Sequence, residues 1–146
     1  MSFVLDASLT LAWCFEDEAT QHTNAVLGAL ENTRALVPSI WFYEVSNAVV
    51  TALRAGRTTE PKVKQFVDLL TELPIDVHPT PPHASTFAGS IRQIALREKL
   101  SAYDASYVAL AAELGLPIAT LDGAGKRLGM KQAAQRAGLT LLNVKA

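Results

Sequence analysis

The feature that most constrains the fold of this sequence is an alternation of short apolar runs with longer amphipathic segments. Five runs have the character of strands, at residues 3–5, 35–38, 75–79, 117–121 and 139–144. The segments between them carry apolar residues at helical spacing. Strands separated by helices form a parallel sheet that is covered by helices on both faces. We therefore predict an α/β fold, a three-layer α/β/α sandwich with a parallel five-stranded sheet.

Length and composition predict one domain that spans residues 1–146. Hydrophobic residues make up 49% of the chain, enough for a sizeable core. The lone cysteine, Cys14, cannot form an intrachain disulfide, and no basic segment precedes an apolar run as in a signal peptide. We therefore expect a cytoplasmic protein. We expect no membrane partner, because no apolar run approaches the roughly 20 residues that cross a bilayer.

Two carboxylates follow strands at positions where a ligand binds. In open parallel sheets the ligand crevice lies beyond the carboxyl ends of the strands. Asp6 directly follows the strand 3–5, and Asp122 directly follows the strand 117–121. The simpler explanation is that each one caps the helix that comes after it.

Two further acids lie on apolar helices. Glu44 and Asp104 have no Lys or Arg three or four residues away, so no ion pair within their own helix neutralises them. Asp104 stands three residues after Ser101, which also fits a capping box, whereas Glu44 has no such explanation. Because burying a carboxylate without compensation is costly, we predict that the four acids converge on a shared partner.

Electrostatics identify that partner as a cation. Two unit charges about 5 Å apart repel by roughly 3 kcal/mol at an effective dielectric constant near 20. Four carboxylates together would cost on the order of 10–20 kcal/mol, which exceeds the stability of about 5–15 kcal/mol that a typical fold has. An all-oxygen site without Cys or His favours Mg²⁺ or Mn²⁺. Such an ion activates water for attack on phosphorus.

Three polar residues accompany the acids. Ser8 lies two residues after Asp6, Asn47 lies one turn beyond Glu44, and Thr120 projects to the same side of its strand as Asp122. We predict that they orient ligands or waters around the metal. Each of them is equally suited to satisfying local backbone groups.

At this point the sequence resembles the PIN-domain ribonucleases, specifically the VapC-type toxins of bacterial type II toxin–antitoxin systems. The matching segments are "VLDASLTLAWCFEDE", "LVPSIWFYEVSNAVVTALRAGR", "LSAYDASYVALAAELGLPIATLD" and "AAQRAGLTLL". The acidic positions of the family fall on Asp6, Glu44, Asp104 and Asp122. The connection after Asp122, "GAGKRLGMKQ", is longer and richer in glycine than is usual in the family.

The resemblance implies strand order 3-2-1-4-5 and a catalytic acid cluster that binds Mg²⁺ or Mn²⁺. It implies an endoribonuclease that cuts single-stranded RNA, often tRNA, as a toxin controlled by a VapB-like antitoxin, and it implies a homodimer. After Asp122 the chain carries five basic residues and no acids. Such a run is usually a solvated helix face, but for an RNA substrate Lys126, Arg127 and Lys131 are candidate phosphate contacts.

Several alternatives remain open. The chain is also compatible with a PIN-domain nuclease that is not a toxin, or with a PIN-like binding module without activity. A phosphoryl-transfer enzyme of the haloacid dehalogenase type would also use Asp6, but it wants a second Asp where Ser8 stands. A receiver-like phospho-acceptor domain wants an acidic pair early and a Lys after a late strand, whereas Lys145 lies too near the end. The segment "GAGKR" lacks the spacing of a phosphate-binding P-loop.

Overall fold

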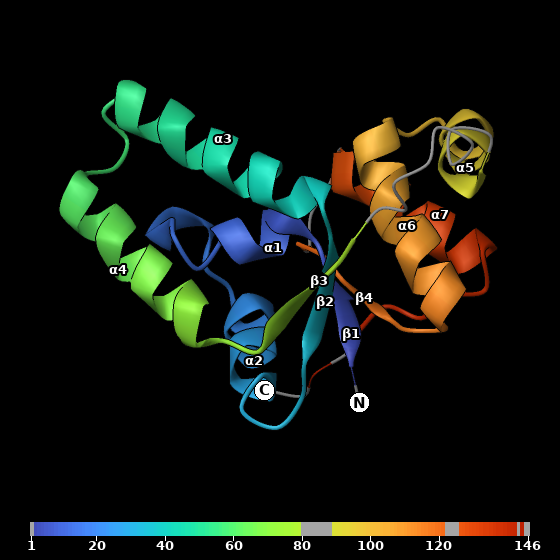
Figure 1. The fold of residues 1–146 in the computed structure, drawn as a ribbon, viewed down its shortest axis with the longest axis horizontal. Coiled ribbons are helices and arrows are strands. Elements are labelled where there is room, and N and C mark those ends of the chain that lie inside the picture. Colours follow the sequence, from blue (N-terminus) through green and yellow to red (C-terminus); the bar gives the residue numbers. More distant parts are fainter. Residues whose placement is uncertain (1, 80–88, 122–125, 143, 145–146) are drawn as a thin grey trace.

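The computed structural model describes residues 2–79, 89–121, 126–142 and 144. Figure 1 shows a parallel sheet between two groups of helices, which confirms the predicted fold class. The elements in chain order are β1 (Phe3–Leu5), α1 (Ala7–Leu11), the 3₁₀ turn η1 (Glu16–Glu18), α2 (Gln21–Ala29), β2 (Ala35–Pro38), α3 (Ile40–Arg54), α4 (Glu60–Glu72), β3 (Ile75–His78), α5 (Ser90–Glu98), α6 (Ala102–Leu114), β4 (Ile118–Ala119) and α7 (Lys126–Arg136).

The sheet has four strands in the order β3-β2-β1-β4, all parallel. This order agrees with the first four positions expected for the family. The prediction of a fifth strand is wrong for the part of the segment that the structure describes. Residues 139–142 form no strand there and make one isolated parallel bridge, between Ile118 and Leu141. Two backbone hydrogen bonds join this segment to Ile118, so it lies at the fifth position without extending the ladder. With only the two-residue β4 beside it, the segment has little strand to pair with.

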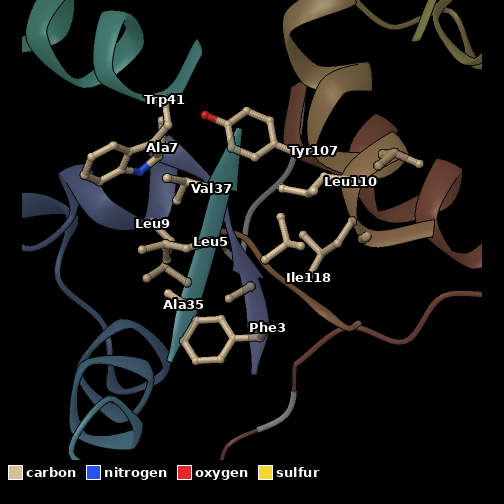
Figure 2. Packing of buried hydrophobic residues seen from close by; sticks show 14 of the residues in the cluster. Phe3, Leu5, Ala7, Leu9, Ala35, Val37, Trp41, Tyr107, Leu110 and Ile118 are labelled. Carbon is tan, nitrogen blue, oxygen red and sulfur yellow. The ribbon is translucent and has the colours of Figure 1, made fainter. Parts of the chain in front are cut away.

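The helices form the outer layers. In Figure 1, α1 to α4 lie on one side of the sheet and α5 to α7 lie on the other. Helix α6 packs against β1 and β2 on its inner side and against α5 and α7 on the others. Its residues from Val108 to Ala111 are therefore all buried. Figure 2 shows the core that results on both faces of β1 and β2, with Phe3, Leu5 and Val37 between the layers.

Local sequence sets the ends of several helices. Pro61 lies in the first turn of α4, where its missing N–H costs nothing. Gly115 ends α6 with φ +66°, a left-handed conformation that glycine adopts without steric cost. Helix α3 begins directly after Ser39, a residue type that commonly caps helices. Ser39 occupies the N-cap position, but its backbone is helical and its side chain makes no capping hydrogen bond. Within the described residues, no helix is both long and apolar enough to cross a membrane.

Candidate active site

Asp6 lies at the carboxyl end of β1 and is almost fully buried, with 1% of its surface exposed. It occupies the N-cap position of α1 with an extended backbone, yet its side chain makes no capping hydrogen bond. The capping explanation for this carboxylate is therefore wrong. Groups other than the first backbone N–H groups of α1 therefore hold its side chain in the protein interior.

Two hydroxyl groups hold the Asp6 carboxylate. Ser8 Oγ donates to Asp6 Oδ2 over 2.6 Å, and Thr120 Oγ1 donates to the same oxygen over 2.7 Å. Thr120 follows β4, so this contact joins the ends of two neighbouring strands across 114 positions of sequence. The hydroxyls fix the position of the carboxylate without cancelling its negative charge.

The second acid, Glu44, meets a tyrosine from the opposite layer. Tyr107 on α6 is fully buried, and its hydroxyl donates to Glu44 Oε1 on α3 over 2.6 Å. Burial, the hydrogen bond to Glu44 and the negative charges of Asp6 and Glu44 together raise the pKa of Tyr107 far above its usual range. Both carboxylates therefore lie near one phenol oxygen.

Asp104 begins the same helix that carries Tyr107. It is half-buried in the first turn of α6, one turn before Tyr107, so the two residues share a helix face. The Ser101 hydroxyl accepts a hydrogen bond from the backbone N–H of Asp104 over 3.0 Å. Ser101 is therefore the N-cap of α6, which is one half of the capping box considered above, and the cap uses the backbone N–H of Asp104.

A buried hydrogen-bond relay connects α3 to the strand that carries Asp6. Trp41 Nε1 donates to Thr10 Oγ1 over 3.0 Å, and Thr10 Oγ1 donates to the backbone oxygen of Asp6 over 3.1 Å. Trp41 lies one turn before Glu44 on α3. The relay therefore fixes the helix of the second acid against the backbone of the first.

A cleft of about 540 Å³ opens beside these acids, between α1 and α3. It brings Asn47 of α3, which is exposed, to the same cleft as Ser8 of α1. The lining also includes Leu11, Thr51, Arg57 and Leu121. A chain-like ligand at the acids has room to continue into this cleft.

Comparison with known proteins identifies the family. A family profile described as the PIN domain matches residues 3–130. The chain belongs to the PIN domain family. PIN domains are generally nucleases, and the resemblance noted from the sequence is confirmed at this level.

Solved structures share the PIN fold along nearly the whole chain. One solved structure is that of VapBC2 from Rickettsia felis bound to a DNA fragment from the promoter. A chain of this structure superposes with a TM-score of 0.64 at 13% identity, and the match covers 99% of the present chain and 100% of the VapBC2 chain. PAE2754 from Pyrobaculum aerophilum superposes with a TM-score of 0.59 at 22% identity, covering 92% and 99%. No curated protein matches the sequence significantly.

The oxygen donors of this PIN domain suit a hard divalent cation. Asp6 and Glu44 supply carboxylates, with no thiol or imidazole beside them among the groups described above. Within the described part of the chain, no three His, Cys, Asp or Glu side chains are grouped closely enough to hold a metal ion. The fourth predicted ligand, Asp122, lies outside the described residues. Asp6 and Glu44, near the Tyr107 hydroxyl, are therefore the described residues best suited to begin such a site.

The predicted RNA contacts of the PIN domain all belong to α7. Lys131 is half-buried, while the side chains of Lys126 and Arg127 lie outside the described part of the structure. Arg136, a further basic residue of this helix, forms an ion pair with Glu98 on α5. At least one charge of the basic run is therefore structural.

Sequence reasoning missed Tyr107, which reads as one more apolar residue on a buried helix. Two signals point to it. A tyrosine on a helix that is apolar all round needs a partner for its hydroxyl inside the protein. It also lies three residues after Asp104, on the face that the acid occupies.

Proposed function

We propose that this PIN domain is a Mg²⁺- or Mn²⁺-dependent endoribonuclease that hydrolyses phosphodiester bonds in single-stranded RNA. The observation that carries the proposal is the approach of the Asp6 and Glu44 carboxylates to the Tyr107 hydroxyl at the carboxyl ends of the strands. Two carboxylates held near each other inside a fold are stabilised by a divalent cation, and family membership makes a nuclease the expected use of that cation.

In this proposal Asp6 and Glu44 hold the ion, and Asp104 and Asp122 complete the acid cluster. When bound, the ion supplies positive charge that activates water and stabilises the phosphate oxygens in the transition state. Ser8 and Thr120 keep the Asp6 carboxylate in one orientation through their two hydrogen bonds. Asn47, at the cleft beside Ser8, positions substrate or water.

The substrate in this proposal is single-stranded RNA, of which tRNA loops are one source. The cleft between α1 and α3 accepts a flexible strand with splayed bases more readily than a rigid duplex. Lys126, Arg127 and Lys131 on α7 contact phosphates, and their contribution weakens as salt increases.

We also propose that the protein is a VapC-type toxin of the cytoplasm, a homodimer, and a partner of a VapB-like antitoxin. The shared fold with a chain of the VapBC2 complex supports the antitoxin. An apolar groove of about 510 Å³ between α3 and α4 also supports a protein partner. Phe42 and Val67 line it, each about half exposed at 52% and 50%. Such exposure favours coverage by another chain.

The test of the nuclease is incubation of the purified protein with single-stranded RNA and with an RNA duplex of the same sequence. We expect cleavage of the single strand with Mg²⁺ or Mn²⁺ and none with chelator. Cleavage that persists in chelator contradicts the metal site, and preference for the duplex contradicts the substrate. Mapping the cut ends in total RNA then identifies the target.

The test of the toxin is growth arrest on expression, relieved by co-expression of an adjacent reading frame that encodes the antitoxin. We expect Val67→Glu to keep the arrest and to weaken the relief, because it places a charge in the apolar groove. Cleavage activity without growth arrest favours a PIN-domain nuclease that is not a toxin.

A further inference from the structure

We propose that Tyr107 is a positioning residue of the active site, whose hydroxyl fixes the Glu44 carboxylate in the orientation that binds the metal. The inference rests on the proposed function, because it gives Glu44 the role of a metal ligand. It adds a residue outside the four acids and their predicted polar neighbours.

The contacts of the Tyr107 hydroxyl set its direction. An ionised carboxylate only accepts hydrogen bonds, so the phenol must supply the proton in its contact with Glu44. That proton goes to Glu44 Oε1 over 2.6 Å. In Figure 2 the hydroxyl points from α6 toward the end of α3 that carries Trp41. In this hydrogen bond the phenol is therefore always the donor and the Glu44 carboxylate the acceptor.

Glu44 is a side chain whose orientation a fixed donor can set. Its side chain has one more rotatable bond than an aspartate and is half-buried on α3, so more rotamers are open to it. Asp6 is almost fully buried and receives two hydroxyl donors. The Tyr107 ring is fully buried, so its hydroxyl is a fixed reference point for the longer side chain.

The position of Tyr107 also connects the three elements that carry acids. It lies on α6 one turn after Asp104 and donates to Glu44 on α3, and the negative charge of Asp6 also acts on its hydroxyl. A shift of α3 relative to α6 changes the hydrogen bond between Tyr107 and Glu44. Hydrogen-bond partners of metal ligands in general contribute about 10–100-fold to metal affinity or activity.

The main test is Tyr107→Phe, which keeps the ring in the core and removes only the hydroxyl. The matched control is Tyr43→Phe, since Tyr43 precedes Glu44 on the same helix but is 72% exposed. Calorimetric titration with Mg²⁺ and Mn²⁺ measures the Kd, and the rise in Tm on adding metal is compared with each variant's own metal-free form. We expect the metal Kd of Tyr107→Phe to increase about 10–100-fold and its metal-induced rise in Tm to shrink.

Kinetics give a second reading. We expect the Mg²⁺ concentration for half-maximal cleavage to increase in Tyr107→Phe by a similar factor, with little change in KM for RNA at saturating metal. Tyr43→Phe should match the wild type in every measurement. A purely structural role for the hydroxyl predicts a lower metal-free Tm with unchanged metal Kd, and that result overturns the proposal.

A fluorine probe tests the proposal even if Tyr107→Phe does not fold. The chain has three tyrosines, so replacing Tyr43 and Tyr103 by Phe leaves Tyr107 alone. With 3-fluorotyrosine incorporated there, its ¹⁹F resonance should move as Mg²⁺ is added, with a midpoint equal to the metal Kd. A resonance that does not respond while the protein binds metal overturns the proposal.

Measurements on the wild-type protein distinguish a failure of the proposed function from a failure of the role proposed for Tyr107. If wild-type protein neither binds Mg²⁺ nor cleaves RNA, the proposed function fails. If wild type does both and Tyr107→Phe behaves identically, only the positioning role of Tyr107 fails.

Discussion

Two buried acids of this protein, Asp6 and Glu98, are held in different ways. Asp6 accepts hydrogen bonds from the hydroxyls of Ser8 and Thr120. The Glu98 side chain is 3% exposed and accepts from two guanidinium groups, Arg97 Nε over 3.0 Å and Arg136 Nε over 2.6 Å. The two hydroxyls orient the carboxylate of Asp6, and the two guanidinium groups orient the carboxylate of Glu98 and also bring positive charge to it.

The difference lies in the kind of donor that holds each carboxylate. Hydrogen bonds from both arginines, with Arg136 the larger cause, lower the pKa of Glu98. This acid joins α5 to α7 through its ion pair with Arg136. The hydroxyl donors orient the Asp6 carboxylate and carry no charge of their own, whereas the arginines supply positive charge directly to Glu98.

The largest expected effect comes from neutralising Asp6. Asp6→Asn should reduce cleavage to the level of the chelated wild type, as should Glu44→Gln and Asp104→Asn. The metal-free Tm should stay the same or increase, because one repelling charge is gone. RNA cleavage and thermal melting in chelator measure both effects. A metal-free Tm of Asp104→Asn far below wild type makes Asp104 a structural residue.

A smaller loss is expected for Asp122→Asn. The glycine-rich connection that follows Asp122 is longer than in the family, which favours a weaker or indirect contact with the metal. The measurement is the RNA cleavage rate of Asp122→Asn compared with that of Asp6→Asn under the same conditions. A loss equal to that of Asp6→Asn gives Asp122 the same weight in the site.

Removing one hydroxyl donor from Asp6 should cost less than removing the carboxylate. Thr120→Val keeps the shape of the side chain and breaks the 2.7 Å hydrogen bond, and Ser8→Ala breaks the 2.6 Å one. We expect each to weaken metal affinity or activity about 10–100-fold. Metal titrations and cleavage rates measure this, and values within twofold of wild type refute an orienting role.

The smallest effect on activity is expected for Glu98→Gln, which should change stability instead. Because the folded pKa of Glu98 is lowered, its ion pairs stabilise the fold above the unfolded pKa of about 4.3 and are lost as pH decreases through the folded value. Glu98→Gln should therefore melt below wild type at pH 7, with the difference vanishing in acid. Melting curves from pH 7 to pH 3 measure it. A difference independent of pH contradicts the assignment.

Much of the fold was predictable because its signals are local. The strand at 35–38 begins and ends where its apolar run does, and Gly115 ends its helix as a glycine should. The prediction of the last strand was wrong because the pairing of a strand depends on its neighbour in the sheet and not on its own sequence alone. The run 139–144 has the composition of a strand, but it meets β4, which is two residues long.

The candidate site was predictable in its charges and less so in its contacts. Asp6 stood out because it directly follows an apolar strand, and Glu44 because no Lys or Arg lies within one turn of it on its helix. The donors that hold them come from distant segments, Thr120 by 114 positions and Tyr107 by 63, and spacing alone does not reveal such pairs. Glu98 appears ordinary in sequence beside Arg97, yet its other arginine lies 38 positions away.

The relay from Trp41 through Thr10 to the backbone of Asp6 makes the alignment of the proposed site depend on residues of the protein interior. A genetic selection for inactive variants would therefore recover substitutions at Trp41 and Thr10 alongside those at the acids. Such variants would present as enzymes with an intact set of charged groups and a misaligned scaffold.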